Sequence, residues 1–295
     1  MRRSIFGFAL CAVVSFFAPT GIEDDDDDTT TVRFLQSANG TLVICGGGEV
    51  SDDIMLQFVE AAGGEDARVV VITTASETAD TDEIEEDLEF WRELKLERLT
   101  VLNAHSRDTA NDPEFIRPLE DASGIWFIGG KQARLADTYV GTASEQKIHA
   151  VLQRGGVVGG ISAGAAVMSS VMIRDGETEP QMGRGFGLLP GMIVDQHFLA
   201  RSRQQRLMGA LAAHPGMVGI GIDEGAAVVV HGRRMTVVGN SDVVACISPS
   251  SGRGAKVETL KPGSQADLVA LSLAATKTRR APLTLRHAIT DAVGD

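Results

Sequence analysis

The sequence predicts an α/β protein, folded as a three-layer sandwich around a mostly parallel central sheet. From residue 41 onward, short apolar runs alternate with longer amphipathic runs. Strand alternating with helix in this rhythm is typical of a parallel sheet that is covered on both faces. A chain of 295 residues, of which 43% are hydrophobic and 23% charged, is long and apolar enough to bury such a core. We therefore expect one domain over residues 41–275.

The expected strands and helices alternate along the first half of this domain. Apolar runs that end in small or polar residues predict strands and their exits at residues 41–48, 67–76, 98–104, 124–130 and 157–164. Amphipathic runs predict helices at residues 52–64, 81–97 and 144–155. Because ligands of such sheets bind beyond the carboxyl ends of the strands, the strand exits are the first places to look for a site.

The second half of the chain has a different pattern. Turns are short and no helix separates the apolar runs at residues 219–239 and 241–248, which favours an antiparallel extension of the same sheet. Residues 258–271 are expected to add an edge strand. Residues 276–295 are predicted to form a peripheral C-terminal segment.

The first residues have the pattern of a secretory signal peptide. Two arginines precede a mostly apolar run, and small residues follow near residues 18–21. The run is shorter than the roughly 20 residues of a membrane-spanning helix, so residues 1–21 are predicted to be cleaved. An uncleaved N-terminal anchor is the alternative. Cleavage predicts a secreted or periplasmic protein in which residues 22–40 form an acidic flexible linker.

Composition argues against several kinds of partner. The formal net charge is −13, but six negative charges lie in one run at residues 23–28, so the rest of the chain is only mildly acidic. Without a basic patch, neither nucleic acid nor, after signal cleavage, a membrane is expected as a partner. Cys45 and Cys246 lie inside apolar segments and are expected to be buried thiols rather than a disulfide. The six histidines are scattered, so no metal site is predicted.

The strongest local signal is a serine among small residues. Gly160 and Gly164 flank Ser162, after an apolar strand and before a stretch that can start a helix. This G-x-S-x-G pattern is typical of a nucleophile elbow, in which a tight strand-to-helix turn presents the serine and only small neighbours avoid a clash. The N–H of Ala163 would then be free to point at a developing oxyanion. The alternative is a glycine-rich turn with an idle serine.

A serine nucleophile needs a general base, and His197 is the candidate. It ends an apolar run, and polar hydrogen-bonding groups cluster around it: Asp195, Gln196, Arg201, Arg203 and Arg206. Three arginines at the start of a helix oppose the helix dipole, and an anionic ligand between them would remove that cost. Alternatively, their stems cover apolar surface while the charged heads stay in water.

Together these stretches resemble the cyanophycinases, within the serine peptidase family S51 that also contains the aspartyl dipeptidases. The resemblance rests on residues 46–76, 127–135, 159–170, 187–207 and 219–230, and it covers residues 41 to about 270. The string D-Q-H-F-x-x-R-x-R-x-x-R-L at residues 195–207 is the most discriminating, because the serine elbow is shared with wider groups. The resemblance implies a catalytic domain with a fold like that of class I glutamine amidotransferases, and a homodimer.

The resemblance also implies a catalytic triad. Ser162 would be the nucleophile and His197 the general base, with an acid between them in chain order. Glu177 and Glu179 both meet that condition, and Glu177 is preferred because its spacing is close to that of the dipeptidase branch.

Further residues receive implied roles in the same way. The backbone N–H groups of Ala163 and Gly130 would form the oxyanion hole. Asp223 and Glu224 follow the histidine in the chain, and they are expected to have a structural or pocket-wall role. The substrate pocket is expected to contain Gln132, Asp195, Gln196, Arg201, Arg203 and Arg206.

The implied substrate is cyanophycin (multi-L-arginyl-poly-L-aspartate) or another β-aspartyl peptide. Each β-carboxyl of its aspartate backbone carries an arginine through an isopeptide bond, and cleavage yields β-Asp-Arg dipeptides. Arginine side chains grip carboxylates bidentately, while Asp and Gln accept hydrogen bonds from guanidinium or amino groups. The expected reaction is acyl transfer to the serine followed by hydrolysis, which needs no metal or cofactor.

Three alternatives remain open from the sequence. An aspartyl or isoaspartyl dipeptidase-like hydrolase would use the same chemistry, but Lys131 stands where that branch has asparagine. A glutamine-amidotransferase-like hydrolase would have cysteine in place of Ser162. A non-catalytic binding protein of the same fold would keep the pocket without turnover.

Overall fold

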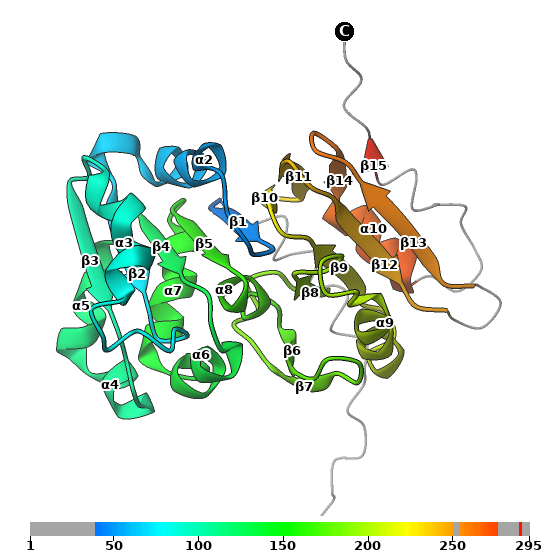
Figure 1. Ribbon diagram of the computed structural model, residues 1–295, viewed down its shortest axis with the longest axis horizontal. Helices are drawn as coiled ribbons and strands as arrows, with labels where there is room; N and C mark the ends of the chain where they lie inside the picture. The colour runs from blue at the N-terminus through cyan, green and yellow to red at the C-terminus, as the bar shows by residue number, and fades with distance from the viewer. Residues whose placement is uncertain (1–38, 250–253, 277–288, 291–295) are drawn as a thin grey trace, which may run out of the picture.

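The computed structural model describes residues 39–249, 254–276 and 289–290 (Figure 1). The predicted signal peptide, nearly all of the predicted linker and most of the predicted C-terminal segment lie outside the described residues. The strands are β1 (Thr41–Cys45), β2 (Arg68–Ile72), β3 (Arg98–Leu102), β4 (Gly124–Phe127), β5 (Val157–Ile161), β6 (Val171–Asp175), β7 (Gln181–Arg184), β8 (Met192–Gln196), β9 (Val218–Ile222), β10 (Ala226–His231), β11 (Arg234–Gly239), β12 (Val243–Ile247), β13 (Lys256–Leu260), β14 (Gln265–Asp267) and β15 (Ile289–Thr290). The helices are α2 (Asp52–Ala62), the 3-10 helix η1 (Gly64–Asp66), α3 (Ile84–Glu93), α4 (Arg107–Asn111), α5 (Pro113–Asp121), α6 (Gln132–Tyr139), α7 (Ala143–Gln153), α8 (Ala163–Ala166), α9 (Gln204–Ala213) and α10 (Leu268–Thr276). Every helix in this part of the chain falls short of the length and apolarity that crossing a membrane requires.

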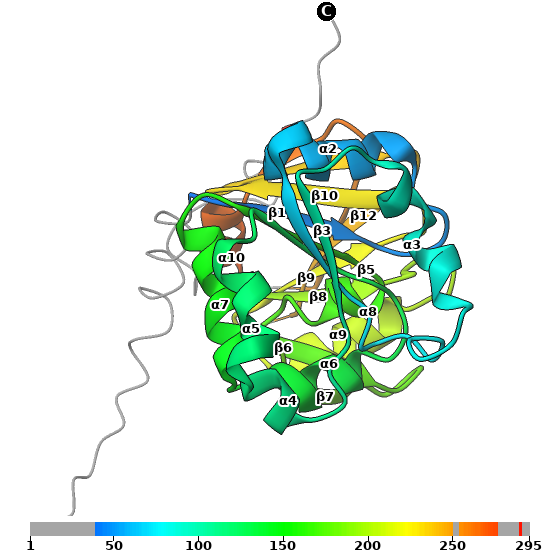
Figure 2. The ribbon, with the colours of Figure 1, turned by 90° about the vertical axis from the view of Figure 1, so that its left-hand side faces the viewer.

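The central layer, within the described residues, is a nine-stranded sheet with the order β15-β14-β11-β10-β1-β5-β4-β2-β3. Strands β1, β5, β4, β2 and β3 are parallel neighbours, and β10, β11, β14 and β15 continue the sheet in antiparallel pairs. Helices α2 and α3 pack on one face, and α5, α6 and α7 pack on the other (Figure 2). The predicted α/β class with a large, mostly parallel central sheet is confirmed, and β10 and β11 form the predicted antiparallel extension.

The apolar residues of the parallel strands explain why these strands lie in the middle layer. Strand β4 is buried along its whole length, and β2 is buried from its second residue onward. Continuous apolar runs of this kind require cover on both faces of the sheet, and helices provide it. On one face Phe58, Trp91 and Trp126 contact one another edge to face or tilted, with ring centroids 5.1 to 5.6 Å apart. Cys45 and Cys246 are free and buried, as predicted.

A second sheet departs from the prediction. In the described chain, β9 and β12 belong to a four-stranded sheet with the order β13-β12-β9-β8 and do not extend the central sheet. Strands β8, β9 and β12 are buried at every position, so they lack the alternation that a one-sided sheet extension would show. The chain changes sheet in the turn at residues 223–225, between β9 and β10. Strand β13 lies at an edge of this second sheet, and it overlaps the start of residues 258–271, where an edge strand was predicted.

The carboxyl ends of the two sheets meet. In the central sheet Cys45 at the end of β1 pairs with Ile161 at the end of β5, so both exits lie at one edge. In the second sheet β8 and β9 are parallel and also end side by side. The N–H of His197, just past β8, donates to the carbonyl of Gly46, just past β1, at 2.9 Å. This junction brings the exits of these four strands together, and the candidate site lies there.

Candidate active site

Ser162 occupies the tight turn between β5 and α8. Its backbone has φ 54° and ψ −105°, outside the regions that residues with side chains normally adopt. The flanking glycines are required by close packing. A Cβ atom at Gly160 would lie 2.8 Å from the carbonyl oxygen of Phe127, and one at Gly164 would lie 2.3 Å from the same oxygen. The local geometry is therefore that of a nucleophile elbow.

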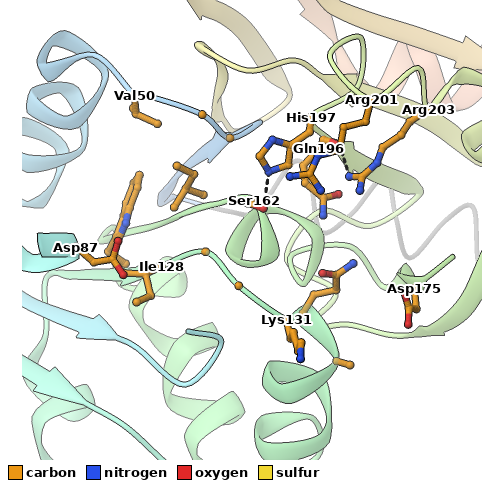
Figure 3. A pocket seen from close by; sticks show the side chains of 18 of the residues that line it. Val50, Asp87, Ile128, Lys131, Ser162, Asp175, Gln196, His197, Arg201 and Arg203 are labelled. Atoms are coloured by element: carbon orange, nitrogen blue, oxygen red, sulfur yellow. Dashed lines mark hydrogen bonds between the residues drawn. The ribbon is translucent and has the colours of Figure 1, made fainter. Parts of the chain in front are cut away.

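His197 follows β8 directly and faces the serine (Figure 3). Its Nε2 lies 2.8 Å from Oγ of Ser162, although the two residues are 35 positions apart in the chain. The imidazole is 11% exposed. The structure thus brings together the two residues that the sequence singles out as nucleophile and base.

The carboxylate next to His197 is Glu224, and the prediction of Glu177 as the partner of this histidine is wrong. Oε1 of Glu224 lies 2.6 Å from Nδ1 of His197. A carboxylate at this position keeps the proton on Nδ1, which leaves Nε2 free to accept from the serine hydroxyl. Glu177 and Glu179 lie instead in the turn between β6 and β7 with exposed side chains, and Glu177 lines the cavity wall. The expected pocket-wall role of Glu224 is corrected accordingly.

Strand register explains why chain order misled the prediction. In the parallel pair of β8 and β9, Gln196 lies opposite Ile222. Residues just past these two ends therefore emerge next to each other, and these include His197 and Glu224. The signal available in the sequence was a pair of buried apolar runs, each followed at once by ionisable residues. Its use required knowing that the two runs are neighbours in one sheet.

The neighbouring Asp223 has the structural role that was expected of it. Its Oδ1 accepts hydrogen bonds from the backbone N–H groups of Leu199 and Ala200, both at 2.9 Å. Its Oδ2 accepts from the hydroxyl of Ser241 at 3.2 Å. One turn, residues 223–225, therefore supplies a carboxylate to the imidazole and a second carboxylate to the backbone that follows it.

The surroundings of His197 favour its neutral form. Burial lowers the pKa of the imidazole below its ordinary value of 6.5, and the charges of Arg201 and Arg203 lower it further. The hydrogen bond to Glu224 and the charge of that carboxylate act in the opposite direction. At neutral pH the ring is therefore unprotonated on Nε2 and can take a proton from Ser162.

Two backbone N–H groups near the serine are the predicted oxyanion donors. The segment after β4 passes close to the nucleophile, since a Cβ atom at Gly129 would lie 3.6 Å from Cβ of Ser162. In the described part of the chain, neither the N–H of Ala163 nor that of Gly130 donates to a backbone acceptor. A Cβ at Gly130 would lie 2.1 Å from the carbonyl oxygen of Ala75, so this position requires glycine. Neither predicted oxyanion donor is therefore occupied by a backbone acceptor of the described residues.

Asp195 lies beneath the arginine cluster and does not line the cavity, contrary to the prediction. Its side chain is fully buried and accepts two hydrogen bonds from Arg206, from Nη2 and from Nε, the latter at 3.1 Å. Arg203 lies 3.8 Å from the same carboxylate. Nη1 of Arg206 also donates to the carbonyl of Gly176 at 2.6 Å. Burial raises the pKa of Asp195 and lowers that of Arg203 to about 10, so Arg203 keeps its charge at neutral pH.

A cavity of about 860 Å³ contains Ser162 and His197 in its wall. The other predicted pocket residues do line it: Gln132, Gln196, Arg201, Arg203 and Arg206. Within the described ranges, the buried Oε1 of Gln196 has no hydrogen-bond partner. Because a buried amide oxygen normally accepts at least one hydrogen bond, this atom offers a place for a donor on the substrate.

Charges of both signs line this cavity. In Figure 3 Asp87 lies on one side of Ser162, and Arg201 and Arg203 lie on the other. Desolvation raises the pKa of Asp87, and the neighbouring Glu86 raises it further. A ligand that carries both carboxylates and cationic groups would find complementary charges here.

Lys131 lines the cavity, and its Nζ pairs with Glu77 at 2.5 Å on an exposed part of the wall.

Among the residues that the structure describes, no group of three or more histidine, cysteine, aspartate and glutamate side chains could hold a metal ion.

The chain is similar in sequence and in fold to known peptidases. The family model described as peptidase family S51 matches residues 42–238. A cyanophycinase from Geminocystis herdmanii is 34% identical over 205 residues, covering 66% of this chain and 75% of that protein. A cyanophycinase from Trichormus variabilis is 35% identical over 214 residues, covering 67% of this chain and 70% of that protein. The crystal structure of a peptidase from an acI-B1 Actinobacterium matches with a TM-score of 0.59 and 26% identity, over 80% of this chain and 99% of that one.

Proposed function

The chain belongs to peptidase family S51 and is a serine-type peptidase, and from that premise we propose that it hydrolyses cyanophycin to β-Asp-Arg dipeptides. The proposed machinery is a triad of Ser162, His197 and Glu224. One observation carries this proposal. Ser162 Oγ, His197 Nε2 and Nδ1, and Glu224 Oε1 form a continuous chain with distances of 2.8 and 2.6 Å, and its serine and histidine lie in the wall of a cavity that arginines also line.

In the proposed acylation step, Oγ of Ser162 attacks the carbonyl carbon of a backbone peptide bond in the polyaspartate chain. Nε2 of His197 takes the hydroxyl proton as the bond from Oγ to carbon forms. Glu224 keeps the imidazole oriented and stabilises its positive charge. The N–H groups of Ala163 and Gly130 stabilise the negative charge that develops on the carbonyl oxygen. The C–N bond then breaks, and His197 gives its proton to the leaving amine.

Deacylation uses the same groups in reverse. Water takes the place of the leaving amine, His197 removes its proton, and the oxygen attacks the acyl-enzyme carbonyl. The ester bond to Ser162 breaks, and the serine recovers its proton from His197. The lowered pKa of His197 suits this role because the base must be neutral at the start of each step.

The cavity fits the charges of the proposed substrate. Each unit of cyanophycin carries a free carboxylate and a guanidinium group. Arg201 and Arg203 supply charged donors for carboxylates, and Asp87 and Glu177 supply acceptors for guanidinium groups. The unpartnered Oε1 of Gln196 supplies a further acceptor.

The experiment that tests this function is release of β-Asp-Arg from insoluble cyanophycin, followed by mass spectrometry. Wild-type protein should release the dipeptide and Ser162→Ala should not. Ser170→Ala, which removes a hydroxyl eight residues away, should behave like wild type. Equal release by Ser162→Ala would overturn the nucleophile. No release by folded wild-type protein would reject the substrate, and activity on β-aspartyl dipeptides would then favour the dipeptidase alternative.

Location and assembly are part of the same proposal. We infer secretion or periplasmic export from the signal-peptide pattern of residues 1–21. N-terminal sequencing of the exported protein should give a start near residue 22, and an intact N-terminus would contradict export by cleavage. A homodimer is expected from the family resemblance, and light scattering of the purified protein measures it directly.

A further inference from the structure

Three consecutive carbonyl groups, at the last residue of β1 and the two residues after it, contact the three segments that carry the proposed triad. We call residues 45–48 the glycine loop. Each of these carbonyls accepts a hydrogen bond from a backbone N–H of a different segment. The pairs are Cys45 with Ser162 at 3.0 Å, Gly46 with His197 at 2.9 Å, and Gly47 with Gly225, which follows Glu224, at 3.1 Å.

Two of these donors belong to strained residues. Among the described residues, three that are not glycine have a positive φ, and Ser162 at 54° and His197 at 48° are two of them. Side chains disfavour this backbone conformation, which persists only where the surroundings enforce it. The N–H groups of Ser162 and His197 are bound by successive carbonyls, so one short stretch enforces both conformations.

The glycine loop also lies against the side chains of the triad. A Cβ atom at Gly47 would lie 2.2 Å from Cε1 and 2.5 Å from Nε2 of His197. A Cβ at Gly48 would lie 2.9 Å from Cβ of Glu224. No side chain fits at Gly47 unless the imidazole or the loop moves. Because Gly47 has no side chain, the imidazole can occupy the position from which it contacts Ser162.

We propose that the glycine loop is a positioning element of the active site. It holds the backbones of Ser162 and His197 and the turn after Glu224 in fixed positions relative to one another. Gly47 packs against the imidazole and so determines where the ring lies. The residues of the loop contribute no reacting group and act through the triad. The inference rests on the proposed triad, and it extends the proposed function by naming what keeps the triad together across two sheets.

The variant that tests this inference is Gly47→Ala. The readout is labelling of Ser162 by a fluorophosphonate, in which the bond from Oγ to phosphorus forms, fluoride leaves and His197 takes the proton. This rate reports the activated serine for any natural substrate. A displacement of about 1 Å at a catalytic group can cost about 100-fold in rate, so Gly47→Ala should be labelled about 100-fold more slowly than wild type.

A matched control separates this effect from backbone strain. Gly155 also has a positive φ, 92°, and a Cβ atom there would have nothing within 4 Å. Gly155→Ala should therefore be labelled at nearly the wild-type rate. Circular dichroism and thermal unfolding show which variants are folded. If Gly47→Ala does not fold, Gly48→Ala replaces it, with an expected loss of about tenfold because the Glu224 side chain can shift.

A second readout reports the imidazole without any reaction. The hydrogen-bonded Nδ1 proton of His197 should give a low-field proton NMR signal in wild type and in Gly155→Ala. The signal should shift or disappear in Gly47→Ala. A loss of loop structure that left the imidazole in place would not move this signal.

The outcomes separate the inference from the function on which it rests. Labelling of Gly47→Ala at the wild-type rate, with an unchanged low-field signal, overturns the positioning role. Failure of wild-type protein to be labelled overturns the role of Ser162 and this inference with it. Labelled wild-type protein that releases no β-Asp-Arg rejects the substrate and leaves the positioning role standing.

Discussion

The two ends of the cavity are built in different ways. At the reacting end, Ser162 and His197 have strained backbones whose N–H groups are bound by carbonyls at the end of β1. At the arginine end, Arg203 and Arg206 are oriented by side-chain contacts with the fully buried Asp195. Main-chain hydrogen bonds thus hold the backbones of the two reacting residues, whereas contacts with one buried carboxylate hold two of the arginines.

Because they are held differently, the two ends should lose function through different substitutions. Main-chain contacts do not depend on any single side chain, so the reacting end loses function when a reacting group itself is removed. The arginine end depends on an ion pair whose side chains are buried, and a buried charge that loses its partner is costly. A substitution can therefore change the groups of one end and leave the groups of the other end in place.

The largest expected effect is at the reacting end. His197→Ala removes the base that takes the proton from Ser162, and kcat/KM should fall by about 10⁴-fold or more. The free energy of unfolding should change only modestly, because the backbone hydrogen bond from residue 197 to the carbonyl of Gly46 remains. Steady-state kinetics and urea unfolding measure the two quantities. A variant within tenfold of wild-type activity would remove His197 from the mechanism.

At the arginine end, the expected effect of a substitution is on the free energy of unfolding. Asp195→Ala leaves the guanidinium of Arg206, which is 3% exposed, without its partner. Breaking a buried pair in this way costs about 3–5 kcal/mol of unfolding free energy. Asp137→Ala is the matched control. It breaks a bidentate pair with Arg174 whose side chains are 63% and 35% exposed, so the loss should stay below about 1 kcal/mol. Equal losses in urea unfolding would contradict the supporting role of Asp195.

A smaller effect links the two ends through charge. Arg201 and Arg203 lower the pKa of His197, whose folded value lies below 6.5. The base is active when neutral, so kcat/KM should be constant above that pKa and fall about tenfold per pH unit below it. Arg201→Gln removes one charge that lowers the pKa, so the acidic limb should move to higher pH. Arg117→Gln, at an exposed pair on α5, should leave it unchanged.

Stability should follow the same titration. A histidine whose pKa is lowered by folding binds fewer protons in the folded state than in the unfolded state. Its contribution is therefore complete above the unfolded value of 6.5 and is lost as the pH falls from 6.5 to the folded pKa. An increase in unfolding free energy as the pH falls through this window, with His197→Ala as the reference, would contradict the assigned direction.

Local sequence patterns predict much of this fold and site. Alternating apolar and amphipathic runs identify the strands and helices of the central sheet, because burial on two faces requires them. The small residues around Ser162 identify the elbow, because a Cβ atom at Gly160 or Gly164 would clash with the strand next to it. The polar cluster after β8 identifies His197. These features are local, so a single sequence contains them.

Features that depend on pairing between distant strands are not predictable in this way. The choice of Glu224 follows from the parallel register of β8 with β9, and no local pattern gives that register. Asp195 was expected in the pocket, but alternation along β8 turns its side chain to the opposite face from that of Gln196, where it meets Arg206. The glycine loop carried no catalytic prediction, because its role depends on contacts with segments more than 100 residues away.

The most direct test of the account compares Glu224→Gln with Glu177→Gln. Each replaces one carboxylate near the cavity by an amide, and of the two only Glu224 contacts Nδ1 of His197. Glu224→Gln should lower kcat by about 10³-fold or more, because the imidazole loses the acceptor that fixes its tautomer. Glu177→Gln should change KM by less than about tenfold and leave kcat near wild type. A large loss of kcat in Glu177→Gln, with Glu224→Gln nearly as active as wild type, would contradict the triad.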